Sequence, residues 1–233
     1  MSNNRILQTH NRSVIYSNEQ WELLELKRNQ AISLMSIFEP FQPFLYGSIA
    51  RGNVHRNSDI DIIFLNEVPS FQIELALEMN GFKNYLREII IATPQDSIRL
   101  YIHLSDLECI TVPLTKMAKE TLQFYDFGGK INLARLKNHE RIPGIDKRLV
   151  FIRPTAKGHE EKSIIDNEHI IARELGINIK TINQRKKILL KREKQGRSGV
   201  FFKHRIEKDE ITEEVLNRLS RRHSLIRKKL YRR

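Results

Sequence analysis

The chain has 233 residues, with 40 Lys and Arg, 28 Asp and Glu, and a single cysteine, Cys109. This length fits one large domain or two modest ones, and a hydrophobic fraction of 40% is enough for a buried core. One cysteine excludes an internal disulfide, and the sequence contains neither a signal-peptide pattern nor an apolar run of membrane length. We therefore expect a soluble protein of a reducing compartment, the cytoplasm.

The charge is divided unevenly along the chain. Residues 1–150 contain 17 basic and 17 acidic residues, so the whole net charge of +12 lies in residues 151–233. A strongly basic segment is typical of proteins that bind a polyanion such as nucleic acid. We expect two domains with different roles, one at 1–145 and a basic one at 146–233.

The predicted elements of the first domain alternate between helix and strand. Ser17 and Gln20 form a capping-box pattern before an amphipathic helix that ends at Pro40. Alternating elements predict an α/β or α+β fold, a mixed sheet with flanking helices. Strands are expected at 44–46, 60–65, 88–92, 98–104 and 108–114, and helices at 71–79 and at 116–138, where Gly128 and Gly129 interrupt the pattern.

The segment between the first two strands carries the most chemistry. It reads Gly-Ser-Ile-Ala-Arg-Gly from Gly47, and Asp59-Ile60-Asp61 follows six residues after its last glycine. Strand alternation places Asp59 and Asp61 on one face, where two carboxylates repel unless a cation compensates them. Two Mg²⁺ ions would do so and would clamp the oxygens of a phosphoryl displacement. Gly47 and Ser48 offer a triphosphate close backbone approach and hydrogen-bond donors.

This arrangement resembles the signature of the DNA polymerase beta-like nucleotidyltransferase superfamily, over about residues 20–115. The resemblance implies a palm-like sheet, with Asp59 and Asp61 as catalytic metal ligands and Gly47 and Ser48 as the phosphate-binding pair. The plain alternative is that Asp59 caps a turn and Asp61 faces solvent. That alternative leaves the preceding Gly-Ser motif unexplained.

The superfamily adds a third carboxylate on a later strand, which helps one metal to activate the acceptor hydroxyl. Glu88 follows a helix and opens a strand, as this acid does in the minimal enzymes, and is our first choice. Asp106 and Glu108 are the alternatives, at an expected hairpin turn where acids are usually solvated. Arg51 is assigned to the triphosphate, with a solvated turn arginine as its alternative.

The basic domain has the spacing of a helix-turn-helix at residues 167–189, although Arg185 occupies a position that such motifs usually keep apolar. Residues 190–206 could add a wing hairpin, which makes a small helical domain of winged helix-turn-helix type a hypothesis. The alternative is an ordinary helix pair whose lysines are merely solvated. The residues assigned to nucleic-acid contact are Lys180, Asn183, Gln184, Lys186, Lys187 and Arg197.

These features predict a Mg²⁺-dependent nucleotidyltransferase that uses an NTP, with ATP expected, and an acceptor hydroxyl on RNA such as tRNA. RNA is favoured over DNA, and no membrane partner is expected. The alternative is a DNA-binding regulator whose palm-like domain senses nucleotide with weak or no catalysis. Absence of a third carboxylate within reach of Asp59 and Asp61 would favour that alternative. A third possibility is one half of a two-component system with a separately encoded partner.

Overall fold

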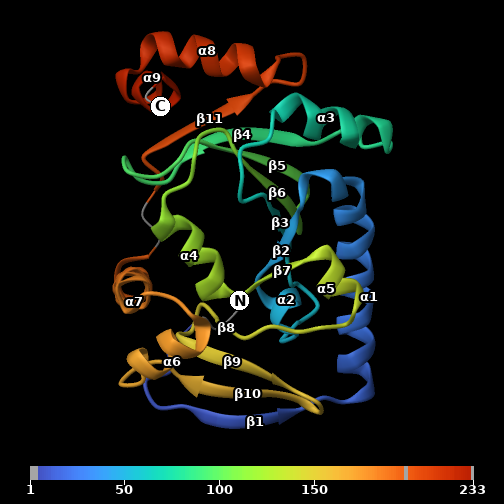
Figure 1. The fold of residues 1–233 in the computed structure, drawn as a ribbon, viewed down its shortest axis with the longest axis vertical. Helices are drawn as coiled ribbons and strands as arrows, with labels where there is room; N and C mark the ends of the chain where they lie inside the picture. The colour runs from blue at the N-terminus through green and yellow to red at the C-terminus, as the bar shows by residue number, and fades with distance from the viewer. Residues whose placement is uncertain (1–4, 197–198, 232–233) are drawn as a thin grey trace.

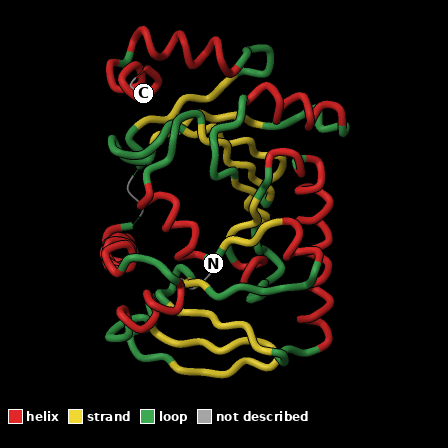
Figure 2. The backbone as a smooth tube through the Cα atoms, viewed as in Figure 1, coloured by secondary structure: helices red, strands yellow, loops and turns green. Residues whose placement is uncertain are grey.

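The computed structural model describes residues 5–196 and 199–231, and its strands form two separate sheets (Figures 1 and 2). The larger sheet is mixed, because β3 and β6 pair in parallel and its other neighbouring strands are antiparallel. The predicted α+β fold is therefore confirmed. In spatial order the strands of the larger sheet are β11 (Phe202–Ile206), β4 (Leu86–Ile91), β5 (Arg99–Ser105), β6 (Glu108–Pro113), β3 (Ile60–Ile63), β2 (Phe44–Tyr46) and β7 (Lys130–Asn132).

The smaller sheet lies at the opposite end of the molecule from β11 (Figure 1). It is antiparallel throughout. Its strands, in order, are β1 (Asn11–Ile15), β10 (Gly158–Ser163), β9 (Val150–Thr155) and β8 (Gly144–Ile145). The helices are α1 (Asn18–Ile37), α2 (Ser48–Arg51), α3 (Ser70–Met79), α4 (Lys119–Gly128), α5 (Leu133–Lys137), α6 (Glu168–Leu175), α7 (Ile179–Gln195), α8 (Thr212–Arg222) and α9 (Ser224–Tyr231), with a short 3-10 turn at Glu39–Phe41. Within the described ranges, no helix has the length and apolar character needed to cross a bilayer.

One face of the larger sheet is buried in the main core. Leu45, Ile62, Ile110 and Ile102 lie opposite one another on successive strands and are fully buried. The long helix α1 covers this face (Figure 1). It begins as predicted, because the Ser17 hydroxyl accepts a hydrogen bond from the Gln20 N–H at 3.3 Å. The other face of the sheet carries the candidate site and, beside it, a smaller apolar cluster around Ile63, Met117 and Tyr125.

The C-terminal segment returns to the larger sheet. β11 pairs with β4, and α8 and α9 contribute Val215, Leu219 and Ile226 to the main core. Buried Arg87 of β4 forms an ion pair with Glu74 of α3 at 2.7 Å, and its other amino group binds backbone carbonyls in residues 207–210. These contacts fix β11 and α8 against the sheet.

The strands cross the boundary expected between residues 145 and 146. β8 ends at Ile145 yet pairs with β9, and β1 from the N-terminal part completes the same small sheet. β11 from the basic part lies in the large sheet. A cut at that boundary would disrupt both sheets, so the structure does not divide into 1–145 and 146–233.

The expected wing hairpin at residues 190–206 has a different structure. α7 continues to Gln195, and β11 hydrogen-bonds to β4, whose outer edge would otherwise be unpaired. α6 and α7 do form two helices joined by a turn, where Gly176 ends α6 with a φ of 64°. The described residues therefore contain the predicted helix pair without the wing.

A buried ionic cluster stabilises the smaller sheet around Glu161. Its carboxylate accepts a hydrogen bond from Arg148 at 2.7 Å and lies 2.6 Å from His10 Nε2 and 3.4 Å from His159 Nε2. The hydrogen bond with His159, followed by those with Arg148 and His10, holds the pKa of Glu161 well below its usual range, although burial opposes the shift.

Because the pKa of Glu161 is lower in the folded than in the unfolded protein, its contribution to stability is present above the unfolded value of about 4.5 and is lost as the pH falls below it. We expect Glu161→Gln to reduce the free energy of unfolding by about 3 kcal/mol at pH 7 and by less at pH 3, where the carboxyl is protonated in the unfolded chain. Urea unfolding at the two pH values measures this. An equal loss at both would contradict the assignment.

Candidate active site

The Gly47-Ser48 segment joins β2 to the short helix α2. Gly47 has a φ of 94°, a conformation that residues with a side chain rarely adopt, and its N–H donates to the Gly129 carbonyl at 2.9 Å. A Cβ there would meet no atom within 4 Å, so the backbone conformation rather than lack of space calls for glycine. The Ser48 hydroxyl donates to the Ser58 hydroxyl at 3.1 Å, which joins α2 to the residue before Asp59.

Asp59 and Asp61 lie at the start of β3. Asp59 is exposed just before the strand, and Asp61 is half-buried within it. Burial, followed by the negative charge of Asp59, raises the pKa of Asp61 to about 6, whereas Lys147 in the turn between β8 and β9 lowers it. The two carboxylates therefore repel each other in a partly desolvated position, which favours a bound cation.

Side chains from the N-terminal part hold the loop between α2 and β3. Sequence reasoning missed these residues, although buried Lys27 gave a signal because it occupies an apolar position of α1. The loop is therefore fixed before any ligand binds. Three hydrogen bonds hold this loop: Tyr16 Oη donates to the Gly52 carbonyl (2.8 Å), Gln20 Nε2 to the Val54 carbonyl (2.7 Å) and Lys27 Nζ to the Ser58 carbonyl (3.1 Å).

A row of side chains runs across the sheet from Asp61, on the face away from α1. Cys109 of β6 lies directly opposite Asp61, His103 of β5 opposite Cys109, and Leu86 of β4 opposite His103. Directly paired residues project from the same face of a sheet. Burial, followed by the charge of Asp61, raises the pKa of Cys109 to about 12, so its thiol stays protonated at neutral pH. The position next to Asp61 on the adjacent strand is therefore neutral.

Comparison with known proteins gives one family. The family model described as a nucleotidyltransferase domain matches residues 33–218, a range that includes both aspartates and much of the basic part. The chain belongs to this nucleotidyltransferase family. The superfamily expected from the motif is thus confirmed, and nucleotidyl transfer is its general activity. No match was found among curated proteins or solved structures.

In this nucleotidyltransferase domain, Glu88 projects from the same face as Asp61 but three strands away. At about 4.8 Å per strand, it lies roughly 14 Å across the sheet from β3. The Glu88 carboxylate instead pairs with Lys203 of β11 at 2.8 Å and lies 3.6 Å from His103 Nε2. The first choice for the third carboxylate is therefore outside metal-bridging reach, because the intervening hairpin separates β4 from β3.

The two alternative acids do not replace Glu88. Glu108 lies opposite Ile60, so it projects toward α1 from the other face of the sheet, and Asp106 is in the exposed turn between β5 and β6. Across residues 5–196 and 199–231, no cluster of three or more His, Cys, Asp and Glu side chains is arranged to hold a metal ion. The nucleotidyltransferase motif thus offers one pair of carboxylates, Asp59 and Asp61, whose oxygen atoms suit Mg²⁺.

Arg51 has a structural role that the sequence did not reveal. It is only 6% exposed, its Nη1 donates to the Gly128 carbonyl, and its Nε donates to Asn53 Oδ1 at 3.1 Å. These bonds tie α2 to the end of α4. Arg51 is therefore neither placed for the expected triphosphate contact nor solvated as in the alternative.

Most of the residues assigned to nucleic-acid contact lie on the free side of α7. Lys186 instead pairs with Glu168 of α6, and Arg197 lies outside the described residues. The other side of α7 packs on α4, where the Arg185 guanidinium lies 4.2 Å from the centre of the Phe124 ring. This stacking explains why Arg185 occupies a position expected to be apolar. The exposed residues are Lys180, Asn183, Gln184 and Lys187.

Proposed function

We propose that the protein is a Mg²⁺-dependent nucleotidyltransferase that moves a nucleoside monophosphate from an NTP, ATP first, to a hydroxyl of RNA, releasing pyrophosphate. The observation that supports this most strongly is the pair Asp59 and Asp61 beside the glycine turn at Gly47, in a member of the nucleotidyltransferase family. The raised pKa of Asp61 is consistent with a site built to hold a cation.

The residues would divide the work as follows. Asp59 and Asp61 would hold Mg²⁺, which supplies charge neutralisation at the phosphates and acidifies the attacking hydroxyl. Gly47 lets the backbone approach the triphosphate closely, because it carries no side chain on that side. The Ser48 hydroxyl, which binds Ser58 in the free protein, can turn to donate to a phosphate oxygen.

Charge supports RNA as the acceptor. All of the net charge of +12 lies in residues 151–233, and Lys180 and Lys187 of this segment lie on the exposed side of α7. Structured RNA such as tRNA presents closely spaced phosphates that such a surface would neutralise. The helix pair α6 and α7 would hold the body of the RNA while the larger sheet holds its reacting end.

Labelled nucleotides test the reaction. We expect label from α-labelled ATP, and none from γ-labelled ATP, to enter a pool of structured RNA when Mg²⁺ is present, with release of pyrophosphate. Each of the other three NTPs is run in parallel to identify the base. Transfer of the γ label alone would contradict nucleotidyl transfer, and transfer of the α label to protein would contradict an RNA acceptor.

A second candidate function rests on one specific observation, the neutral Cys109 opposite Asp61 where a third carboxylate could complete the site. A two-carboxylate site could bind an NTP and turn it over slowly, so the protein would act as a nucleotide-sensing regulator that binds DNA. Tight ATP binding, a duplex DNA footprint and no transfer product would together support this candidate against the first.

A further inference from the structure

We propose that the pocket between β4, β5 and β11 binds single-stranded RNA a few nucleotides before its reacting hydroxyl. This inference rests on the proposed function, and it names the part of the acceptor that the larger sheet recognises. The pocket has a volume of about 370 Å³ and opens on the same face of the sheet as Asp61. None of its residues belongs to the Gly-Ser motif or to the helix pair α6 and α7.

The pocket lies in line with the candidate active site. His103 lines it and stands two strands from Asp61, in the row that contains Cys109. Two strand spacings of about 4.8 Å make a separation of roughly 10 Å. Stacked nucleotides of one strand are roughly 3.4 Å apart, so about three of them cover this separation. A strand whose terminal hydroxyl lies at Asp61 would therefore place a nearby base at the pocket.

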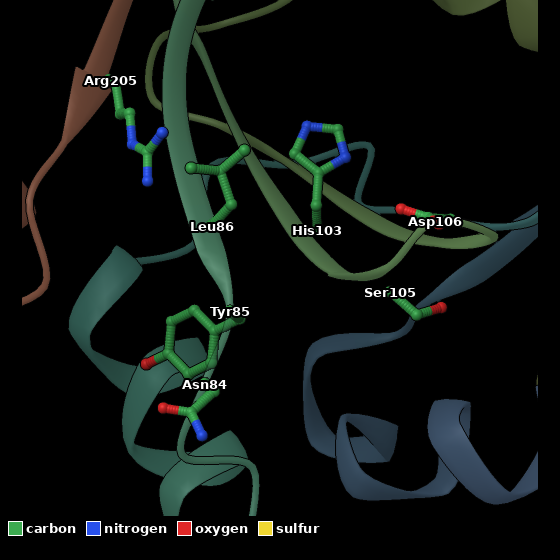
Figure 3. Close-up of a pocket in the computed structure, with 7 residues that line it drawn as sticks. All are labelled: Asn84, Tyr85, Leu86, His103, Ser105, Asp106 and Arg205. Carbon is green, nitrogen blue, oxygen red and sulfur yellow. The ribbon is translucent and has the colours of Figure 1, made fainter.

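The side chains of the pocket suit an unpaired nucleotide (Figure 3). His103 presents a ring on which a base can stack, and stacking on aromatic side chains is the usual way of holding single-stranded bases, whereas the Tyr85 ring packs against the main core. Asn84 and Asp106 add an amide and a carboxylate that can bind the polar edge of a base. A base inside a duplex could not enter, because its faces are already stacked.

Positively charged side chains lie along the β11 side of the pocket. Arg205 of β11 lines it, is exposed, and has no ion-pair partner in the described part of the chain. Lys203 lies on the same face of β11, and Lys208 donates to Asn84 Oδ1 at 3.1 Å, which orients that amide. These cations come from the basic C-terminal part, and β11 brings them to the sheet that carries Asp61. They are placed to bind the phosphates on either side of a stacked base.

His103 is held in position for stacking. Its ring lies 6.4 Å from that of Tyr101 and is nearly parallel to it, with an interplanar angle of 17°. Glu88 lies 3.6 Å from its Nε2 and also binds Lys203. The acid that sequence reasoning assigned to catalysis is therefore a positioning residue of the RNA pocket, because it connects β11 to the ring of His103.

Binding of a fluorescently labelled single-stranded RNA of about ten nucleotides tests the proposal without turnover. We expect Arg205→Ala to weaken binding about tenfold and to reduce the slope of log K against log salt by about 0.7. The matched control is Arg12→Ala, which removes the same charge from an exposed position of β1 in the smaller sheet. It should change binding by less than about twofold.

A crosslink gives the position of the RNA. With 4-thiouridine third from the 3′ end, we expect photocrosslinks to Asn84, Leu86 or His103, and we expect His103→Leu to abolish those to residue 103. Crosslinks confined to α7, equal effects of Arg205→Ala and Arg12→Ala, or equal competition by duplex RNA would each overturn the proposal. So would the absence of RNA binding.

ATP binding and transfer are measured on the same variants. Arg205→Ala should leave the affinity for ATP unchanged, because β11 is four strands from β3. RNA that binds in the pocket but receives no α label would contradict the proposed function and leave this inference standing. RNA that receives label but crosslinks elsewhere would contradict the inference and leave the proposed function standing.

Discussion

The Asp61→Asn variant is expected to lose nucleotidyl transfer by roughly 10³-fold. Asp61 provides one of the two carboxylates that could hold the cation. Metal ions supply several kcal/mol of stabilisation to a phosphoryl-transfer transition state, and each factor of ten in rate corresponds to about 1.4 kcal/mol. Incorporation of α-labelled ATP at saturating Mg²⁺ measures the loss. Asp59→Asn should reduce transfer by a similar factor. Because Asp59 is exposed, this substitution should not destabilise the fold.

The matched control is Glu108→Gln, which removes an acid that projects from the opposite face of the sheet. It should retain transfer within about twofold, because its carboxylate cannot reach a cation bound by Asp61. Loss of activity in both variants would show that the acids act through a shared structural effect. Retention of activity in Asp61→Asn would contradict the assignment of the site.

The thermal stability of Asp61→Asn shows whether the variant loses activity because the cation site is lost or because the protein unfolds. The pKa of Asp61 is raised to about 6 by burial and by Asp59, so the charged form destabilises the metal-free protein. This cost appears as the pH rises from the unfolded value near 3.8 to about 6 and is constant above it. Asp61→Asn should therefore melt at a higher temperature than the native chain above pH 6, without Mg²⁺, and the difference should vanish near pH 4.

Much of the fold was predictable where apolar periodicity was strong. The helix from Ser17, the strands on either side of the glycine turn and the hairpin before Pro113 all lie close to their expected positions. The alternation of Ile60 and Ile62 with the two aspartates also placed the acids on one face, because period-two patterning is the direct signature of a strand with one buried side.

The smaller sheet was only partly predictable, because the apolar run at Val150–Ile152 indicates a strand whereas the buried positions of β10 are polar. β10 has the sequence GHEEKS, and its inward-facing side chains are His159, Glu161 and Ser163, which form hydrogen bonds rather than an apolar stripe. Charged and polar residues inside a core follow no periodic rule that sequence reasoning can use. β1 pairs with β10 and was missed because four of its five residues are exposed and give no apolar alternation.

The course of the C-terminal segment depends on long-range packing. Val215, Leu219 and Ile226 predict helices with an apolar face, but no local pattern states which core that face joins. Two contacts determine which core the helices join: β11 pairs with the edge strand β4, and Arg87 of β4 binds the Glu207 carbonyl. Long-range pairing also separates Glu88 from Asp61, because β5 and β6 lie between β4 and β3 and the order of strands in a sheet is independent of their order in the sequence.

The Cys109→Asp variant is expected to depend on Mg²⁺ for its stability. The new carboxylate would lie directly opposite Asp61 and near Asp59, on the same half-buried face. Three repelling carboxylates without a cation should cost about 3 kcal/mol, and a bound Mg²⁺ would relieve much of that cost. For a chain of this length we expect saturating Mg²⁺ to raise the melting temperature of the variant by about 6–12 °C more than that of the native protein.

Two substitutions serve as controls for Cys109→Asp. Cys109→Ser changes the thiol without adding charge and should show the native response to Mg²⁺. Thr111→Asp adds a carboxylate on the same face of β6, but opposite Ile63 instead of Asp61, so it should be destabilised without rescue by Mg²⁺. Equal Mg²⁺ responses of Cys109→Asp and Thr111→Asp would contradict the inference that Cys109 occupies the third ligand position.

Activity of the Cys109→Asp variant separates the two candidate functions. If the native protein is a transferase, two carboxylates are sufficient and the third should change the rate of α-label transfer by no more than about tenfold. If it is a nucleotide sensor, the missing acid limits the reaction, and Cys109→Asp should produce transfer where the native chain produces none. A third outcome is a variant that is stabilised by Mg²⁺ and binds ATP but transfers no label. The metal site would then be complete and catalysis absent, so the missing third acid would not be the reason that the sensor lacks activity.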